Sequence, residues 1–188
     1  MLEAINQLLQ AIRIAPIQSL ATADTKQDAA DAKFALDNAS REIQLKGWEF
    51  NTEYDYVLSL EVGTGYAKVP NNTLSVRASR NYGTTKFTIR GNRLYNSTTH
   101  TYVWTEAPVV ELVIALPYED LPEAFKRYVI GKAAQMFCKP KLPSGATFQY
   151  TDQYLMEALR QAAEEDARQM DYDLTQTSPH FQKMRTRR

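Results

Sequence analysis

The sequence contains little that would support a disulfide scaffold, a metal cluster or a membrane anchor. Its 188 residues include one cysteine, Cys138, and two histidines, His100 and His180. A single cysteine excludes an internal disulfide and a four-cysteine metal site, and its apolar helical setting is typical of a small core residue. The first residues lack the basic start and apolar run of a signal peptide, and no stretch reaches the about 20 apolar residues of a membrane helix. We therefore expect a protein of an aqueous compartment, with no membrane partner.

The sequence also lacks a net charge, because 22 Lys and Arg residues balance 22 Asp and Glu residues. A neutral chain generates no overall field that attracts nucleic acid or an anionic membrane, so any electrostatic role must be local. Hydrophobic residues make up 44% of the chain and charged residues 23%, which is ordinary for a folded soluble protein. The length suits one domain, or a compact body with one inserted module.

Motifs that carry common chemistries are missing. There is no GxxxxGK[ST] or GxGxxG loop for phosphate, no HExxH helix for zinc and no GxSxG nucleophile elbow. We predict no catalytic, cofactor-binding or metal-binding residues, although a Ser/His/Asp triad assembled only in space stays open. Trp48, Trp104 and the 11 tyrosines would suit a sugar or base platform, but strand preference and core packing account for most of them.

Helical periodicity marks both ends of the chain. Apolar residues recur at three- and four-residue steps from Leu2 to Ile12, and Pro16 ends this first helix. A second helix is expected from a cap at Asp24 or Thr25 to about Lys46, with Gly47 as its stop. Its inward positions are mostly small, which allows close approach of a neighbouring helix. They are Ala29, Ala32, Ala35, Leu36, Ala39 and Ile43.

Two more helices are expected after Pro117. Asp120 and Glu123 resemble a capping box for a helix that ends before Pro140. A longer helix should run from about Phe148 to Asp171. Apolar positions define the inward faces of both helices. These positions are Leu121, Phe125, Tyr128, Val129, Ala133 and Met136 in the first, and Leu155, Ala158, Leu159, Ala162, Ala163, Ala167 and Met170 in the second.

The middle of the chain has the texture of β structure. Residues 48–117 are rich in Tyr, Val, Thr and Asn, with alternating apolar and polar positions. The segments FNTEYDYVLSLEV, YAKVP and TLSVRAS are predicted strands, and Gly91-Asn92 is a two-residue hairpin signal. The run VVELVIALP predicts a strand buried on both faces. Five to seven strands of this kind suit a small sandwich or barrel.

The fold class predicted from this order is α+β. Residues 1–47 and 118–172 are expected to form a discontinuous helical bundle, with residues 48–117 inserted as an antiparallel β module. Residues 173–188 have no periodicity and are predicted to form a flexible basic tail. The tail contains Lys183, Arg185, Arg187 and Arg188.

An acidic group in the last helix is the main candidate for chemistry. It consists of the neighbours Glu164, Glu165 and Asp166. A glycoside hydrolase needs two carboxyl groups about 5 to 9.5 Å apart on either side of the scissile bond. Consecutive helical residues point in different directions, so a solvated helix face is the simpler interpretation.

Three segments resemble the podovirus tail tubular protein A family. The stretch DAADAKFALDNASREIQLKGWEFNTE has an alanine-rich helix, a charged turn, Gly47-Trp48 and Phe50-Asn51 in the order that the family shows. PYEDLPEAFKRYVIGKAAQMF is similar to the family's return into the helical bundle, and LMEALRQAAEEDARQMDYD to its last long helix. Together these segments cover about a third of the chain.

The resemblance implies a structural virion protein and not an enzyme. Such a protein is an adaptor, of which twelve copies form a ring between the portal and the tail nozzle made by tail tubular protein B. Viral DNA passes through the ring without sequence-specific binding, and no cofactor takes part. The location implied is the tail of the virion, after assembly in the host cytoplasm.

Two hypotheses concern the charged residues. Glu157, Glu164, Glu165 and Asp166 would face the lumen, where like charge keeps DNA from sticking. The basic tail residues Lys183, Arg185, Arg187 and Arg188 would dock on an acidic partner. The alternatives from other classes are a tail-associated glycan hydrolase and a binding module that uses the β part alone.

Overall fold

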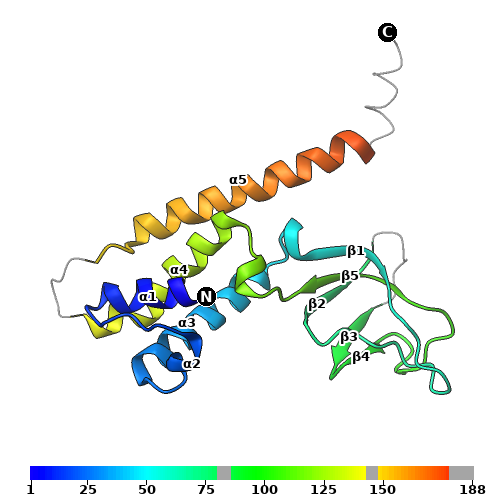
Figure 1. Ribbon diagram of the computed structural model, residues 1–188. Helices are drawn as coiled ribbons and strands as arrows, with labels where there is room; N and C mark the ends of the chain where they lie inside the picture. The colour runs from blue at the N-terminus through cyan, green and yellow to red at the C-terminus, as the bar shows by residue number, and fades with distance from the viewer. Residues whose placement is uncertain (80–85, 143–147, 178–188) are drawn as a thin grey trace, which may run out of the picture. The chain divides into compact units, whose positions relative to one another are not determined.

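The computed structural model describes residues 1–79, 86–142 and 148–177 of the chain, with side chains described as far as residue 170. Two compact units divide these residues (Figure 1). One contains Met1–Ile43 and the described part of Pro117–Arg188, and the other is Gln44–Leu116. The first unit is helical and the second contains antiparallel strands. The predicted α+β class with an inserted antiparallel β module is confirmed.

The helical unit is built from helices of both chain ends. α1 packs on α4, and α4 lies beside α5 (Figure 1). Leu8 and Leu9 of α1, Leu36 of α3 and Phe125 of α4 are almost fully buried. The small inward positions predicted for α3, from Ala29 to Ile43, are all buried. The helices are α1 Leu2–Ala11, α2 Leu20–Ala23, α3 Gln27–Gln44, α4 Glu123–Phe137 and α5 Asp152–Thr177.

Two helix starts differ from the predictions. The segment expected to be a polar loop contains α2, whose N-cap Ser19 accepts a hydrogen bond from the Thr22 amide. The capping box expected at Asp120 and Glu123 does not form, because Tyr118–Asp120 is a short 3-10 helix and Pro122 is the N-cap of α4. A proline forces the residue before it into extended backbone, so the helix cannot begin earlier.

The inward faces of α4 and α5 differ in part from the predictions. Met136 of α4 is 45% exposed. On α5, Ala158 and Ala162 are buried, whereas Ala163, Ala167 and Met170 are exposed. The contact with α4 therefore covers a narrower stripe of α5 than the apolar pattern of the sequence indicated. The helix also continues to Thr177, beyond the expected end at about Asp171 and into the predicted tail, and residues 178–188 of that tail lie outside the described residues.

The described residues of the β module form two small antiparallel sheets. One has the strand order β1-β5-β2, and the other is the β3–β4 hairpin. The hairpin turns at Gly91-Asn92 as predicted, and Gly91 has a φ of +65°, which the turn requires. The predicted strand YAKVP forms only isolated bridges, among them Leu60 with Ala67. The strands are β1 Thr52–Val57, β2 Thr73–Ala78, β3 Phe87–Arg90, β4 Arg93–Asn96 and β5 Val109–Ile114.

Both sheets contribute to one core. Leu94 of β4 packs with Val110 and Leu112 of the central strand β5, and all three are fully buried. Trp104 belongs to the same core and is 8% exposed, while its indole N–H donates to the Leu94 carbonyl at 3.1 Å. Trp104 is therefore a packing residue and not part of an exposed aromatic platform.

Two buried amide side chains join the segments by which the chain enters and leaves the module. The Gln44 side chain donates to the Leu116 carbonyl at 3.1 Å and accepts from the Leu116 amide at 2.7 Å. The Asn51 side chain donates to the Gln44 carbonyl at 3.0 Å and to the Ile114 carbonyl at 2.8 Å. Its Oδ1 accepts from the Trp48 amide at 2.9 Å. The two bonds between Gln44 and Leu116 join residues 72 positions apart, and the bond from Asn51 to Ile114 joins residues 63 positions apart. We call the whole group of bonds the amide clamp.

Candidate docking surfaces

The acidic residues predicted for α5 form ion pairs along the helix. Arg160 donates to Glu157 at 2.7 Å and also to Glu164, one turn further on. Arg168 lies 3.4 Å from Glu165. The hydrogen bonds from Arg160 and Gln161 lower the pKa of Glu157 to about 2. Three glutamates and two arginines leave this face with a net charge of about −1, so it is far less negative than the glutamates alone indicated.

Asp166 does not share this exposed face. Its side chain is buried, with 8% exposure, whereas Glu157 and Glu164 are exposed. The expectation that all four carboxylates lie on one solvated face was wrong for Asp166. The helical repeat explains this, because Asp166 lies four residues after buried Ala162 and eight after buried Ala158.

The basic residues predicted for docking, Lys183, Arg185, Arg187 and Arg188, lie outside the described residues, as does His180. The other histidine, His100, is exposed in a turn with a φ of +56°. Its Nδ1 lies 3.4 Å from the Tyr95 hydroxyl. Within the described part of the chain, no group of three His, Cys, Asp or Glu side chains is arranged to hold a metal ion.

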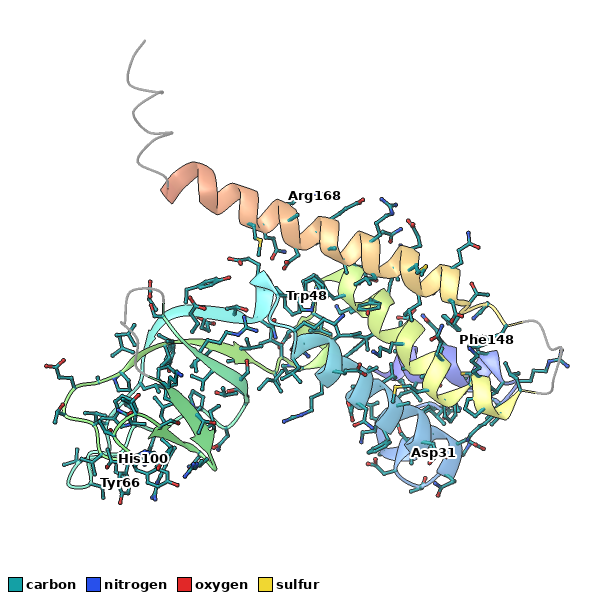
Figure 2. The ribbon with its side chains drawn as sticks, turned by 180° about the vertical axis from the view of Figure 1, so that it is seen from behind. Asp31, Trp48, Tyr66, His100, Phe148 and Arg168 are labelled. Carbon is teal, nitrogen blue, oxygen red and sulfur yellow. The ribbon has the colours of Figure 1, made fainter. Side chains whose placement is uncertain are left out.

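One surface of the β module gathers tyrosine and arginine side chains. It contains Tyr66, Arg90, Arg93, Tyr95 and Tyr102, and we call it the tyrosine–arginine patch. The rings of Tyr95 and Tyr102 have centroids 4.9 Å apart, and those of Tyr66 and Tyr102 are 6.1 Å apart. The Arg90 guanidinium lies 3.6 Å from the centre of the Tyr95 ring, and the Arg93 guanidinium lies 4.5 Å from that of Tyr66. Figure 2 labels Tyr66 and His100, which both belong to the β module.

The local backbone explains how the patch forms. Arg90 and Arg93 are cross-strand partners that flank the Gly91-Asn92 turn. Isolated bridges attach Tyr66 to Val103 and Lys68 to Arg93, which brings the neighbouring loops against the hairpin. Stacking on the tyrosine rings holds both guanidinium groups in place.

The two arginines differ in their charge partners. Glu61 lies 4.0 Å from Arg93 and 3.2 Å from Lys68, and its hydrogen bonds from Thr64 and Lys68 lower its pKa. Among the described residues, no carboxylate lies within salt-bridge distance of Arg90. Arg90 therefore presents a positive charge that the described part of the chain leaves unneutralised.

Sequence reasoning missed this patch. Its residues are spread from position 66 to position 102, and no local periodicity joins them. The available signal was the segment RGNRLY, in which two arginines flank a hairpin turn and a tyrosine follows.

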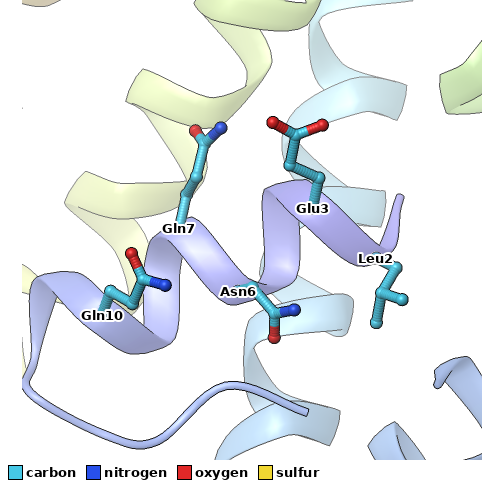
Figure 3. A pocket seen from close by; sticks show the side chains of 5 residues that line it. All are labelled: Leu2, Glu3, Asn6, Gln7 and Gln10. Carbon is cyan, nitrogen blue, oxygen red and sulfur yellow. The ribbon is translucent and has the colours of Figure 1, made fainter. Parts of the chain in front are cut away.

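An open pocket of about 380 Å³ lies along α1 and is lined by Leu2, Glu3, Asn6, Gln7 and Gln10 (Figure 3). Asn6 also fixes the following loop, since its amide group exchanges two hydrogen bonds with the backbone of Ile17. The pocket contains one carboxylate, so it does not offer the carboxyl pair of a glycoside hydrolase.

The fold and its surfaces define an α+β protein in which a β module with an aromatic and basic surface interrupts a helical unit. The chain belongs to the tail tubular protein family, whose model matches residues 2–172. It is therefore a structural protein of a bacteriophage tail and a component of the virion. No curated protein matches the sequence significantly. None of the described helices is both long and apolar enough for a membrane span.

Proposed function

We propose that this chain is the adaptor subunit of a short-tailed phage, and that about twelve copies form a ring between the portal and the tail nozzle. Viral DNA passes through the ring during ejection. The observation that carries the proposal is the family match over residues 2–172, which spans both units. The proposed partners are further copies of the chain, the portal protein and the nozzle protein.

The organisation of the chain supports this role. A ring subunit needs two different surfaces for its neighbours, and an adaptor needs further surfaces for the rings above and below it. The helical unit and the β module have separate cores, and the amide clamp ties together the entry and exit of the module. Two cores on one chain provide more distinct faces than a single small domain.

Electron microscopy of the purified chain mixed with the portal protein of the same phage tests the proposal. We expect a ring stacked on the portal. A chain that stays monomeric with both the portal and the nozzle protein would contradict the adaptor role. It would favour a binding module that uses the β part alone.

The charged segments have proposed roles within this ring. Glu157, Glu164 and Glu165 face the DNA path, where their arginine partners leave only a weak negative charge. Buried Asp166 is not part of this surface. A ring structure in which these glutamates point away from the lumen would remove this assignment.

Lys183, Arg185, Arg187 and Arg188 are proposed to dock on an acidic surface of the portal or of a neighbouring copy. Deletion of residues 182–188 should weaken assembly most at low salt, because screening already reduces ionic contacts at high salt. Assembly that is unchanged at every salt concentration would contradict this role.

The proposal includes no catalytic role, and the glycan hydrolase alternative has a direct test. A reducing-sugar assay of the purified chain on host polysaccharide should give no signal. Activity that disappears in the Glu164→Gln, Glu165→Gln double variant would replace the structural role with an enzymatic one.

A further inference from the structure

The β module carries opposite charges on two separate surfaces. The tyrosine–arginine patch lies on the β3–β4 hairpin and its adjoining loops, and β3 contacts β2. β2 forms one edge of the three-stranded sheet, and β1 forms the other. On β1, all residues from Glu53 to Val57 are exposed. They include Glu53, Asp55, Tyr56 and Val57, which we call the acidic edge.

The tyrosine–arginine patch carries positive charge that the described residues do not fully neutralise. Arg90 and Arg93 are directly opposite each other at the end of the hairpin, and like charges in that position repel. Of these two arginines, Glu61 approaches only Arg93, at 4.0 Å, and Glu61 also pairs with Lys68 at 3.2 Å. A carboxylate from another molecule would relieve the repulsion and would meet guanidinium groups already held on tyrosine rings.

The residues around the tyrosine–arginine patch favour a protein over DNA as its binding partner. Val62 is 99% exposed and Val103 is 51% exposed, and both lie in the loops that contain or adjoin the patch tyrosines. Apolar side chains gain nothing from a phosphate backbone but are stabilised in a protein interface, where Tyr and Arg are also enriched.

The acidic edge has the complementary composition. Glu53 forms no ion pair with any described residue, and Val57 is 60% exposed. The edge does not suit addition of another strand, because a bulge between Glu53 and Tyr56 interrupts the register and Asp55 has a φ of +49°. Contact at this edge must therefore be made by side chains.

We propose that the tyrosine–arginine patch of one copy docks on the acidic edge of β1 in a second copy. The inference rests on the proposed ring, because two different surfaces on one chain make a head-to-tail contact that can close. Arg90 meets Glu53 in this contact, and the exposed valines of the two surfaces pack against each other.

Charge reversal tests this contact. Sedimentation velocity with the portal protein present would compare the wild type with Arg90→Glu and Glu53→Lys, each of which should weaken self-association by about tenfold. An equimolar mixture of the two variants should assemble nearly as well as the wild type, since alternating copies restore an opposite-charge pair at every contact. Arg127→Glu, an exposed site on α4, is the control with the same charge change.

The outcomes separate this inference from the ring itself. If the wild type assembles and the single variants assemble equally well, or if the mixture stays defective, the proposed contact is wrong and the ring stands. The same holds if Arg90→Glu only reduces DNA binding or portal binding. A wild type that forms no ring removes both proposals. Circular dichroism checks folding, and Arg90→Gln replaces Arg90→Glu if the latter does not fold.

Discussion

Loss of the Asn51 side chain should destabilise the β module strongly. Asn51 is 1% exposed and makes three hydrogen bonds, to the Gln44 carbonyl, the Ile114 carbonyl and the Trp48 amide. Asn51→Ala leaves all three backbone groups without these partners. At about 1 kcal/mol for each bond, the free energy of unfolding should fall by about 3 kcal/mol.

Asn51→Asp keeps the shape of the side chain but reverses its hydrogen-bonding role. A carboxylate would face two carbonyl oxygens, so the folded state should raise its pKa above the unfolded value of about 3.9. The folded state then binds more protons than the unfolded state, so stability falls as the pH rises from about 4 through the raised pKa. Asn51→Asp should thus be closest to the wild type below about pH 4.

Urea unfolding followed by tryptophan fluorescence measures both effects, because Trp48 and Trp104 both belong to the β module unit. Asn72→Ala is the matched control, since Asn72 is exposed and its amide nitrogen lies 3.5 Å from the Ala115 carbonyl. Asn51→Ala with a loss as small as that of the control, under about 0.5 kcal/mol, would refute the clamp. If the stability of Asn51→Asp did not depend on pH, the burial of this side chain against the two carbonyl oxygens would be refuted.

Three further predictions concern the helical unit. Gly131→Ala should lower the stability of this unit by about 1 kcal/mol, because an added Cβ would lie 2.9 Å from the Tyr154 ring, and overpacking of about 1–3 kcal/mol outweighs the helix propensity gain of about 1 kcal/mol. Thermal unfolding followed by circular dichroism should show that adding Tyr154→Leu restores the lost stability. A double variant as unstable as Gly131→Ala would show that contact with the Tyr154 ring is not the cause. Burial raises the pKa of the Cys138 thiol to about 11, and the thiol donates to the Leu8 carbonyl at 3.4 Å, so Ellman's reagent should react slowly with the native chain and fully in guanidinium. Fast native labelling would contradict this burial. Glu157 should titrate by NMR near pH 2, and Arg160→Ala should return its pKa toward 4.5. The stability from this depressed pKa is present above about pH 4.5 and is lost as the pH falls toward 2, and an unshifted Glu157 titration would show that the pair is not formed in solution.

The sequence by itself determined most of the strands, the hairpin at Gly91-Asn92, the family and the four longer α-helices, but not α2. These features depend on neighbours within a few residues, so spacing reports them directly. Gly47 is an example, because α3 ends at Gln44 and the Gly47 amide bonds to the Gln44 carbonyl at 3.1 Å, with a φ of +73°. Motif order within such local segments also carried the resemblance that the family match confirmed.

The tertiary structure alone decided which side chains meet across long stretches of chain. The amide clamp joins Asn51 to Ile114, and the tyrosine–arginine patch joins Tyr66 to Arg93. The same holds for α5, where a regular apolar pattern could not show that Asp166 is buried while Ala163 and Ala167 are exposed. Helical periodicity defines a face but not its width, because the width depends on which neighbour covers it.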